Sequence, residues 1–283
     1  MTEWIDGKRV AQRIRDQVAH DVATSFTADT SPGLATVLVG DDPASAVYVG
    51  SKRRMVRHLG MRDVHRAVPS DAAQAEVAAV LDELAEDPAV SGILLQLPLP
   101  SGLDAAALID RIPVAKDVDG LSTVSAGLLA RDRFGLRPCT PAGVLELLDA
   151  EGVKIEGATA VVVGRSDLVG RPMGQMLVNR DATVTVTHKA TPDLPAVTRE
   201  ADVLVVAAGV HGLIGPEHVK PGATVIDVGI HRTPAGLAGD VRAAELGGLA
   251  RRLTPVPGGV GPMTIAMLMA NTVKAARWAR RLA

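Results

Sequence analysis

The chain has 283 residues, enough for two domains of ordinary size with a large buried core. Its formal net charge of −2 gives no overall basic field that would favour nucleic acid as a partner. Its apolar runs are too short to cross a bilayer, and its first residues lack the apolar core of a signal peptide. Its single cysteine excludes an intramolecular disulfide or a cysteine-cluster metal site. We therefore expect a cytoplasmic protein without nucleic-acid or membrane partners.

Strand and helix patterns alternate through the first half of the chain. Strands are predicted at residues 34–39 and 92–97, and helices at residues 43–59, 72–86 and 104–111. The pattern loosens around residues 120–140. Thr140 as a cap and Pro141 at the first helical position then predict the start of another helix.

The second half repeats the alternation. Helices are predicted at 140–151 and 172–179, and strands at 160–163, 183–187, 203–207 and 224–228. An amphipathic helix over 265–282 ends the chain, and we expect it to pack back on the first domain. The sequence thus predicts an α/β fold of two α/β domains, the second a Rossmann-like parallel-sheet nucleotide-binding domain. The expected boundaries are 1–138 plus 264–283, and 139–263.

A glycine-punctuated loop follows the strand at 160–163, in the sequence AVVVGRSDLVGRPMG. Gly164 and Gly170 would let the backbone approach a pyrophosphate, and the following helix N-terminus favours negative charge. The spacing G-x-S-x-x-x-G is not the usual G-x-G-x-x-G. The pattern alone is therefore equally compatible with an ordinary strand-to-helix turn.

The residues after the next strand bear on the choice of nucleotide. NAD-specific folds place an acidic residue there to bind the ribose hydroxyls, whereas a 2′-phosphate needs cations. His188 and Lys189 follow the strand at 183–187, and Arg165 stands beside the first loop glycine. These residues favour NADP.

The predicted helix at 43–59 carries a lysine on its expected apolar face. We expect that face to consist of Ala44, Tyr48, Met55 and Leu59, and Lys52 falls on the same stripe. The residue pattern by itself favours a lysine that snorkels to solvent. In a cleft, loss of solvation would instead favour the neutral amine, which is a useful general base.

Three other segments each have a structural and a functional interpretation. Gln96 either satisfies backbone groups at a strand end, the commoner case, or presents an amide where α/β sites open. KDVDG at 116–120 lacks the later acidic ligand of a calcium loop. The motif is either a charged turn or a turn that presents the Asp119 carboxylate to an amino-heterocycle. The glycine-rich segment 254–264 either crosses between domains or exposes backbone groups to a ligand.

The motifs, taken in order along nearly the whole chain, resemble the methylenetetrahydrofolate dehydrogenase/cyclohydrolase (FolD) family. They are SAVYVGSKRRM at 45–55, GILLQLPLP at 92–100, KDVDG at 116–120, RPCTPAG at 137–143, VVVGRSDLVGRPM at 161–173, AAG at 207–209, VIDVGI at 225–230, GDV at 239–241 and TPVPGGVGPMT at 254–264.

This resemblance implies NADP-dependent oxidation of 5,10-methylenetetrahydrofolate, followed by hydrolysis of the methenyl product to 10-formyltetrahydrofolate, in one-carbon metabolism and purine biosynthesis. Lys52 would transfer protons in the hydrolytic step and Gln96 would tune it. Tyr48 would stack on the folate, and Asp119 would bind the polar edge of the pterin. The first domain would then be the folate-binding, catalytic one, and no metal is implied.

The same resemblance assigns the remaining site residues. Further substrate-binding residues would be Leu97, Pro98, Gly259, Val260 and Pro262. The NADP site would comprise Gly164, Arg165, Ser166, Gly170, His188, Lys189, Gly209 and Ile230. The family also implies a homodimer formed through the nucleotide domain.

The chain departs from the family pattern in two places. After KDVDG it continues LSTVSAGLL, where the family usually has an aromatic residue and a nearby asparagine, so folate entry is put in doubt. Lys189 stands where a small hydroxyl residue usually follows the histidine. This second departure would strengthen binding of a 2′-phosphate.

Three alternatives stay open. A different two-domain NADP dehydrogenase, for example one acting on a hydroxy acid, would leave Tyr48 and TPVPGGVGPMT unexplained. A non-catalytic nucleotide-binding or folate-sensing module would not need Lys52, Gln96 and Asp119 together. A member that keeps only the dehydrogenase step is disfavoured by the presence of both Lys52 and Gln96.

The substitution Lys189→Glu is expected to shift cofactor preference from NADP⁺ toward NAD⁺. A carboxylate would repel the 2′-phosphate and accept hydrogen bonds from the ribose hydroxyls. Steady-state kinetics with both cofactors measure the preference. An unchanged ratio of the two kcat/KM values would refute the assignment of Lys189.

Overall fold

The computed structural model describes residues 1–282, which divide into two compact units. The six-stranded unit combines Met1–Gln12 with Thr140–Thr264, and the three-stranded unit contains Arg13–Cys139 and the residues from Ile265 onward. The prediction counted residues 1–12 with the first domain. They belong instead with the six-stranded unit, because strand β1 (Glu3–Trp4) pairs with β11 (Arg252–Leu253).

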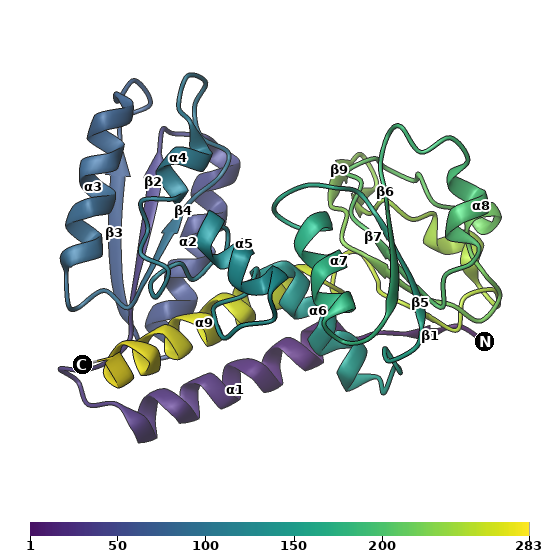
Figure 1. The fold of residues 1–283 in the computed structure, drawn as a ribbon, viewed down its shortest axis with the longest axis horizontal. Helices are drawn as coiled ribbons and strands as arrows, with labels where there is room; N and C mark the ends of the chain where they lie inside the picture. The colour runs from purple at the N-terminus through teal and green to yellow at the C-terminus, as the bar shows by residue number, and fades with distance from the viewer. Residues whose placement is uncertain (283) are drawn as a thin grey trace. The chain divides into compact units, whose positions relative to one another are not determined.

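A parallel sheet in the order β3-β2-β4 forms the centre of the three-stranded unit (Figure 1). Its strands are β2 (Gly33–Val39), β3 (Arg62–Val68) and β4 (Gly92–Leu95). Its helices are α2 (Pro43–His58), α3 (Gln74–Glu86), α4 (Ala105–Ile109) and α5 (Thr123–Ala130).

Alternation along β2 and β4 divides the core of this unit between the two faces of the sheet. Leu34 and Leu94 lie in one cluster with Val56 of α2. Val37 and Leu95 lie in the other cluster, which includes Val77, Leu81 and Leu84 of α3. The sheet is therefore covered on both faces, as parallel sheets require.

Helix α9 (Gly261–Leu282) contributes Leu268, Met269 and Val273 to the first of these clusters. It also carries a buried amide, because Asn271 Nδ2 donates to the carbonyl oxygens of Val118 and Arg137, each at 2.8 Å. These two bonds tie the helix to the segment that follows β4.

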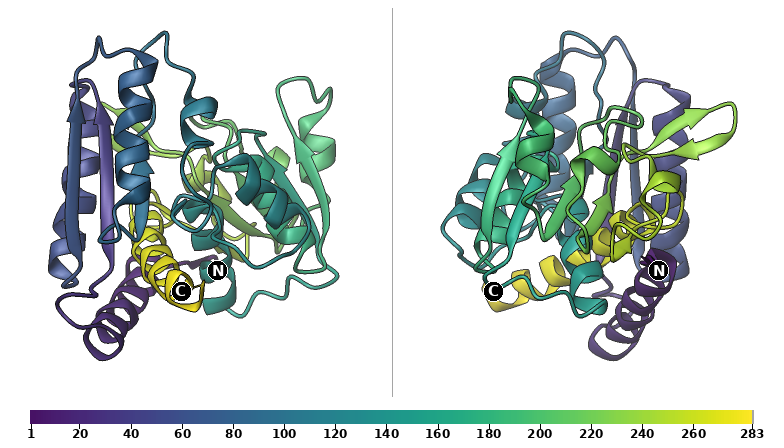
Figure 2. Two further views of the ribbon diagram at one scale, coloured as in Figure 1. Left: turned by 60° about the vertical axis from the view of Figure 1, so that its left-hand side comes forward. Right: turned by 90° about the vertical axis from the view of Figure 1, so that its right-hand side faces the viewer.

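The six-stranded unit has a wholly parallel sheet in the order β1-β11-β8-β7-β5-β6 (Figure 1). Its other strands are β5 (Thr159–Val163), β6 (Thr183–Thr187), β7 (Val203–Val206) and β8 (Thr224–Asp227). The hairpin β9–β10 (His231–Thr233 and Gly236–Ala238) pairs only with itself among the described residues, and it projects outward in Figure 2. Helical segments are α6 (Cys139–Ala150), α7 (Gly170–Val178), α8 (Leu194–Thr198), η1 (Pro216–His218) and η2 (Ala243–Leu246).

The strand order reverses at β5. The chain passes from β5 to β6 on one side, and then to β7 on the other side of β5. Ligands of open α/β sheets bind outside the carboxyl ends of the strands at such a reversal. The glycine loop after β5 and the AAG segment after β7 both lie at this place.

The α/β fold class and the parallel nucleotide-domain sheet are confirmed, but several elements were missed. The prediction omitted helix α1 (Gly7–Ser25), strand β3 and helix α5. In β3, RDVHRAV, only Val68 is buried, so no apolar run marks this edge strand. No helix of residues 1–282 is long and apolar enough to span a membrane.

The predicted start of the helix at 140 also needs correction. Helix α6 begins at Cys139, so Thr140 lies inside it. Its hydroxyl is instead paired with that of Thr264 at 2.9 Å.

Replacing Asn271 with alanine should lower the free energy of unfolding by about 2–3 kcal/mol, because two carbonyls inside the fold lose their donor. Urea titration of the purified protein measures this loss. Gln17→Ala is the matched control, since it removes an exposed amide bonded to Asp21. A loss no larger than that of the control would contradict the structural role of Asn271.

Candidate active site

Helix α2 carries the predicted catalytic lysine. Asp42 Oδ2 accepts from the backbone N–H of Ser45 at 2.7 Å, and Pro43 occupies the first turn. Gly60 follows the helix with φ +70°.

The buried face of α2 differs from the prediction. It consists of Ser45, Val49 and Val56, whereas Ala44 and Tyr48 are exposed. The predicted stripe was therefore wrong by about one residue in the first turns. Small residues take the buried places where α2 lies against β2 and β3, and an apolar pattern alone does not reveal a buried serine such as Ser45.

Lys52 is half-buried at the border of this face and contacts Gln96. Lys52 Nζ donates to Gln96 Oε1 at 3.0 Å. Gln96 follows the end of β4, and its Nε2 donates to the carbonyl of Leu97 at 2.5 Å. Because the amide nitrogen is engaged by the backbone, the amide oxygen is left to face the lysine. The amide is thus oriented, and it presents a neutral acceptor rather than a charge.

Asp119 lies within electrostatic reach of Lys52, beside the thiol of Cys139. Burial raises the pKa of the Asp119 carboxyl, while the positive charge of Lys52 acts in the opposite direction. Burial and the neighbouring Asp119 charge raise the pKa of the Cys139 thiol well above its ordinary value. The Cys139 side chain is therefore a neutral neighbour of the carboxylate.

The other charged residues of KDVDG have structural roles. Lys116 Nζ donates to the carbonyls of Ala85 and Asp87 at 2.7 and 2.8 Å, at the end of α3. Buried Asp117 accepts from the N–H of Ser122 and the hydroxyl of Ser125 at 2.9 and 2.6 Å. Lys116 therefore fixes the motif to the end of α3, and Asp117 stabilises the turn that follows. Asp119 is the remaining charged residue of the motif, and it lies near Lys52.

The remaining predicted substrate residues of this unit differ in exposure. Tyr48 lies one helical turn before Lys52, with 48% of its surface exposed. Leu97 is half-buried and Pro98 is exposed directly after Gln96. An exposed aromatic ring beside a half-buried lysine suits a flat, polar-edged ligand.

The glycine loop of the six-stranded unit depends on close backbone contacts. Gly164 has φ +118°, and a Cβ built there would lie 2.1 Å from the carbonyl oxygen of Ala207. A Cβ on Gly170 would lie 2.1 Å from the oxygen of Gly164. Neither position accepts a side chain, so the loop after β5 is held against both the AAG segment and the start of α7.

The N-terminus of α7 and the residues after β6 supply groups suited to phosphates. Ser166 Oγ accepts from the N–H of Val169 at 3.2 Å and of Gly170 at 3.4 Å. Arg165, His188 and Lys189 are all exposed. His188 Nδ1 accepts from the N–H of Ala190 at 3.2 Å, which orients its ring.

Two buried carboxylates near this loop were not found from the sequence. Asp240 Oδ2 accepts from the backbone N–H groups of Ala208 and Gly209 at 2.7 and 2.8 Å. Asp227 accepts from the N–H groups of Gly229, Asp240 and Val241. Burial raises the pKa of Asp227 to about 6, although these bonds favour its charged form. GDV and VIDVGI, noted above only as motifs, were the available signal.

The last predicted residues lie in the glycine-rich segment before α9, in the six-stranded unit. A Cβ on Gly259 would lie 2.6 Å from the oxygen of Pro255, and the Val260 side chain is 4% exposed. Ile230 is 47% exposed and Gly209 is exposed with φ +68°. The predicted site residues thus form one group around Lys52 in the three-stranded unit. In the other unit they lie in the loops after β5, β6 and β7, after β8, and in the segment after β11.

Comparison with known proteins gives matches along nearly the whole chain. The model of the tetrahydrofolate dehydrogenase/cyclohydrolase catalytic domain matches residues 5–119, and that of the family's NAD(P)-binding domain matches residues 138–280. A curated bifunctional protein FolD 2 from Frankia alni is 66% identical over 275 residues, covering 96% of this chain and 95% of the relative.

Solved structures agree with this similarity. The bifunctional FolD of Campylobacter jejuni has a TM-score of 0.96 and 41% identity, over 99% of this chain and 100% of that one. The Trypanosoma brucei methylenetetrahydrofolate dehydrogenase-cyclohydrolase, solved with NADP and an inhibitor, has a TM-score of 0.93 and 38% identity, over 99% of each chain.

Proposed function

Because the chain belongs to the tetrahydrofolate dehydrogenase/cyclohydrolase family, we propose that Lys52, Gln96 and Asp119 carry its hydrolytic chemistry and that the loops at the strand reversal bind its nucleotide. The protein is a bifunctional enzyme that oxidises 5,10-methylenetetrahydrofolate with NADP⁺ and hydrolyses the 5,10-methenyl product to 10-formyltetrahydrofolate. The oriented contact between Lys52 and Gln96 is the observation that supports the assignment most directly.

Hydrolysis of the methenyl cation needs proton transfer, which Lys52 is placed to supply. Water adds to the cationic carbon and loses a proton, which gives a carbinol. The carbinol hydroxyl then loses its proton as the formyl C=O forms, and a ring nitrogen takes up a proton as its bond to that carbon breaks, so that one proton is released overall. The neutral amide oxygen of Gln96 accepts a hydrogen bond from the Lys52 nitrogen and so fixes the position of the amine. Lys52 therefore acts as base and then as acid.

Tyr48 and Asp119 bind the substrate in this proposal. The exposed ring of Tyr48 stacks on the folate, and Asp119 accepts hydrogen bonds from the amino edge of the pterin. Asp119 is desolvated by burial, so hydrogen bonds donated by the amino edge of the pterin would replace the water contacts that its carboxylate has lost. Leu97 and Pro98 complete the substrate-binding residues of the three-stranded unit. Gly259, Val260 and Pro262 are the proposed substrate-binding residues of the six-stranded unit.

The nucleotide site uses backbone and cationic groups. The loop of Gly164 and Gly170 allows the close approach that a pyrophosphate needs, and Ser166 organises the start of α7. Arg165, His188 and Lys189 are suited to the 2′-phosphate, and Gly209 and Ile230 are further cofactor-binding residues. NADP⁺, when bound, accepts the hydride from the methylene carbon. The protein's contribution to this step is alignment.

Lys52→Met should abolish decay of methenyltetrahydrofolate, measured without nucleotide, by at least about 100-fold, since the general base is lost. The matched control is Lys154→Met, the same substitution at an exposed lysine. NADP⁺ reduction with methylenetetrahydrofolate is measured in parallel. Methenyl decay that persists in the Lys52 variant would remove Lys52 from the mechanism.

We also propose that the predicted first domain, without residues 1–12, binds folate, that the six-stranded unit binds NADP, and that the enzyme is a homodimer through the latter. The hairpin β9–β10 supports dimerisation, because an isolated two-stranded hairpin is marginally stable and this one exposes Leu237. A cytoplasmic location, and supply of one-carbon units to purine biosynthesis, follow from the proposed activity. Fractionation of the source cells tests the location, and a purine requirement on deletion tests the pathway.

Sedimentation equilibrium should give twice the mass of the 29.3 kDa chain, and Leu237→Asp should shift the protein toward monomer. A charge at this exposed apolar position would be desolvated in the interface. A monomeric wild-type protein at micromolar concentration would contradict the homodimer. A dimer that Leu237→Asp leaves intact would place the interface elsewhere.

A further inference from the structure

The segment after β7 is bound by groups that the proposed mechanism does not use. It begins at Ala207. A Cβ built on Gly164 would lie only 2.1 Å from the carbonyl oxygen of Ala207. We call residues 207–215 the β7 loop. Because its first residues touch the glycine loop backbone to backbone, their position determines the shape of the proposed nucleotide site.

Asp240 is the group that holds the first part of the β7 loop. Its side chain is fully buried, and its Oδ2 accepts from the backbone N–H groups of both Ala208 and Gly209. Its backbone carbonyl accepts from the N–H of Ile214 at 3.0 Å, so Asp240 contacts both ends of the loop. A carboxylate bound to two backbone donors holds them more firmly than a neutral acceptor would.

His231 is the partner of the other carboxylate oxygen. Its Nε2 lies 2.7 Å from Asp240 Oδ1. Gly229 makes this approach possible, because a Cβ there would lie 2.3 Å from the same oxygen. His231 directly follows Ile230, a proposed cofactor-binding residue, so the pair links two segments of the proposed nucleotide site.

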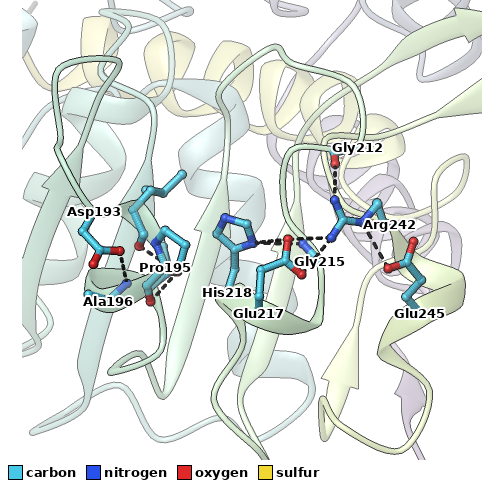
Figure 3. Close-up of polar contacts among 11 residues, drawn as sticks. Asp193, Pro195, Ala196, Gly212, Gly215, Glu217, His218, Arg242 and Glu245 are labelled. Carbon is cyan, nitrogen blue, oxygen red and sulfur yellow. Dashed lines mark hydrogen bonds and ion pairs between the residues drawn. The ribbon is translucent and has the colours of Figure 1, made fainter.

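A second cluster anchors the far part of the β7 loop (Figure 3). Arg242 donates to the carbonyl of Gly212 at 3.3 Å and to Glu217 at 2.6 and 2.8 Å. It also pairs with Glu245 at 3.2 Å. These contacts lie on residues that no part of the proposed nucleotide site uses. Arg242 therefore provides a neighbouring anchor against which the Asp240 pair can be compared.

We propose that Asp240 and His231 are positioning residues for NADP: together they hold the N–H groups of Ala208 and Gly209, and so fix the β7 loop against the glycine loop. This inference rests on the proposed nucleotide site. The pair touches no reacting atom, and its effect is on nucleotide affinity rather than on proton transfer. His231 supplies the donor that keeps the carboxylate turned toward the two amides.

The test is calorimetric titration of NADP⁺ into the full-length protein and its variants. Asp240→Asn and His231→Leu should each weaken binding about tenfold or more, since one charge-assisted contact is lost or misdirected. His231→Gln places an amide donor near the same point and should restore affinity to within about threefold. Arg242→Leu removes only the anchor at Gly212, in the far part of the β7 loop, and as the matched comparison it should weaken binding by less than about threefold.

Decay of methenyltetrahydrofolate without nucleotide reports whether each variant is folded. It should stay within about twofold of wild type in all four variants, because that step does not use the nucleotide. Unchanged NADP⁺ affinity in both Asp240→Asn and His231→Leu would overturn the proposal. Equal weakening of NADP⁺ binding by Arg242→Leu would also overturn it. So would a joint loss of NADP⁺ binding and of methenyl decay in the Asp240 and His231 variants, since either result indicates a general structural role.

Failure of the underlying site assignment gives a different result. Lys189→Glu acts directly on the proposed 2′-phosphate contact and is titrated beside the other variants. If it weakens NADP⁺ binding while the Asp240 and His231 variants do not, only the positioning role is wrong. If none of the three weakens binding, the proposed nucleotide site is wrong, and the positioning role is rejected with it.

Discussion

Close approach of backbone to backbone at the carboxyl ends of β5 and β7 is the constraint on which the six-stranded unit depends. Gly164 meets Ala207, and Gly170 meets Gly164, at separations that leave no room for a Cβ. A loop packed this tightly has few polar groups free to move, so each N–H and carbonyl needs a fixed partner or a ligand. Buried carboxylates supply those partners on the side of β7, and Ser166 supplies them at α7.

In the three-stranded unit, the amine for which we propose proton transfer, that of Lys52, is held by an amide and not by a carboxylate. A carboxylate in direct contact would favour the charged form strongly, whereas an amide oxygen holds the nitrogen with less bias. Gln96 can do this only because Leu97 engages its other end. Asp119 adds negative charge at longer range, without a direct bond to Lys52 among the hydrogen bonds of the described residues.

In both units, charged side chains hold the conformation of a loop by hydrogen bonds to its backbone. In each case a neighbouring carboxylate is the group to which we assign a role in the proposed site. In KDVDG, Lys116 caps α3 and Asp117 holds the next turn, so Asp119 is free to face the site. After β8, Asp227 holds the Gly229 and Val241 N–H groups, and Asp240 holds the β7 loop. Charged residues close together in sequence therefore have distinct roles, which depend on the distant segments they meet.

The sequence by itself determined the fold class, the parallel sheet of the six-stranded unit and the family, and it singled out Lys52 as the candidate residue for proton transfer. Apolar β-branched strands, glycine spacing and ordered motifs are local properties of the sequence. They can be recognised without knowing which segments pack against them. The predicted interior face of α2 was wrong, and β3 and α1 were missed, because burial there depends on what packs from elsewhere.

Only the tertiary structure decided which atoms meet. It turned the amide of Gln96 toward Lys52, separated the roles of Asp117 and Asp119, and placed Asp240 under the β7 loop. Asp240 lies more than 30 residues along the chain from the amides that it binds. No local pattern encodes such a contact, because its energy comes from burying a charge where the fold brings distant donors together.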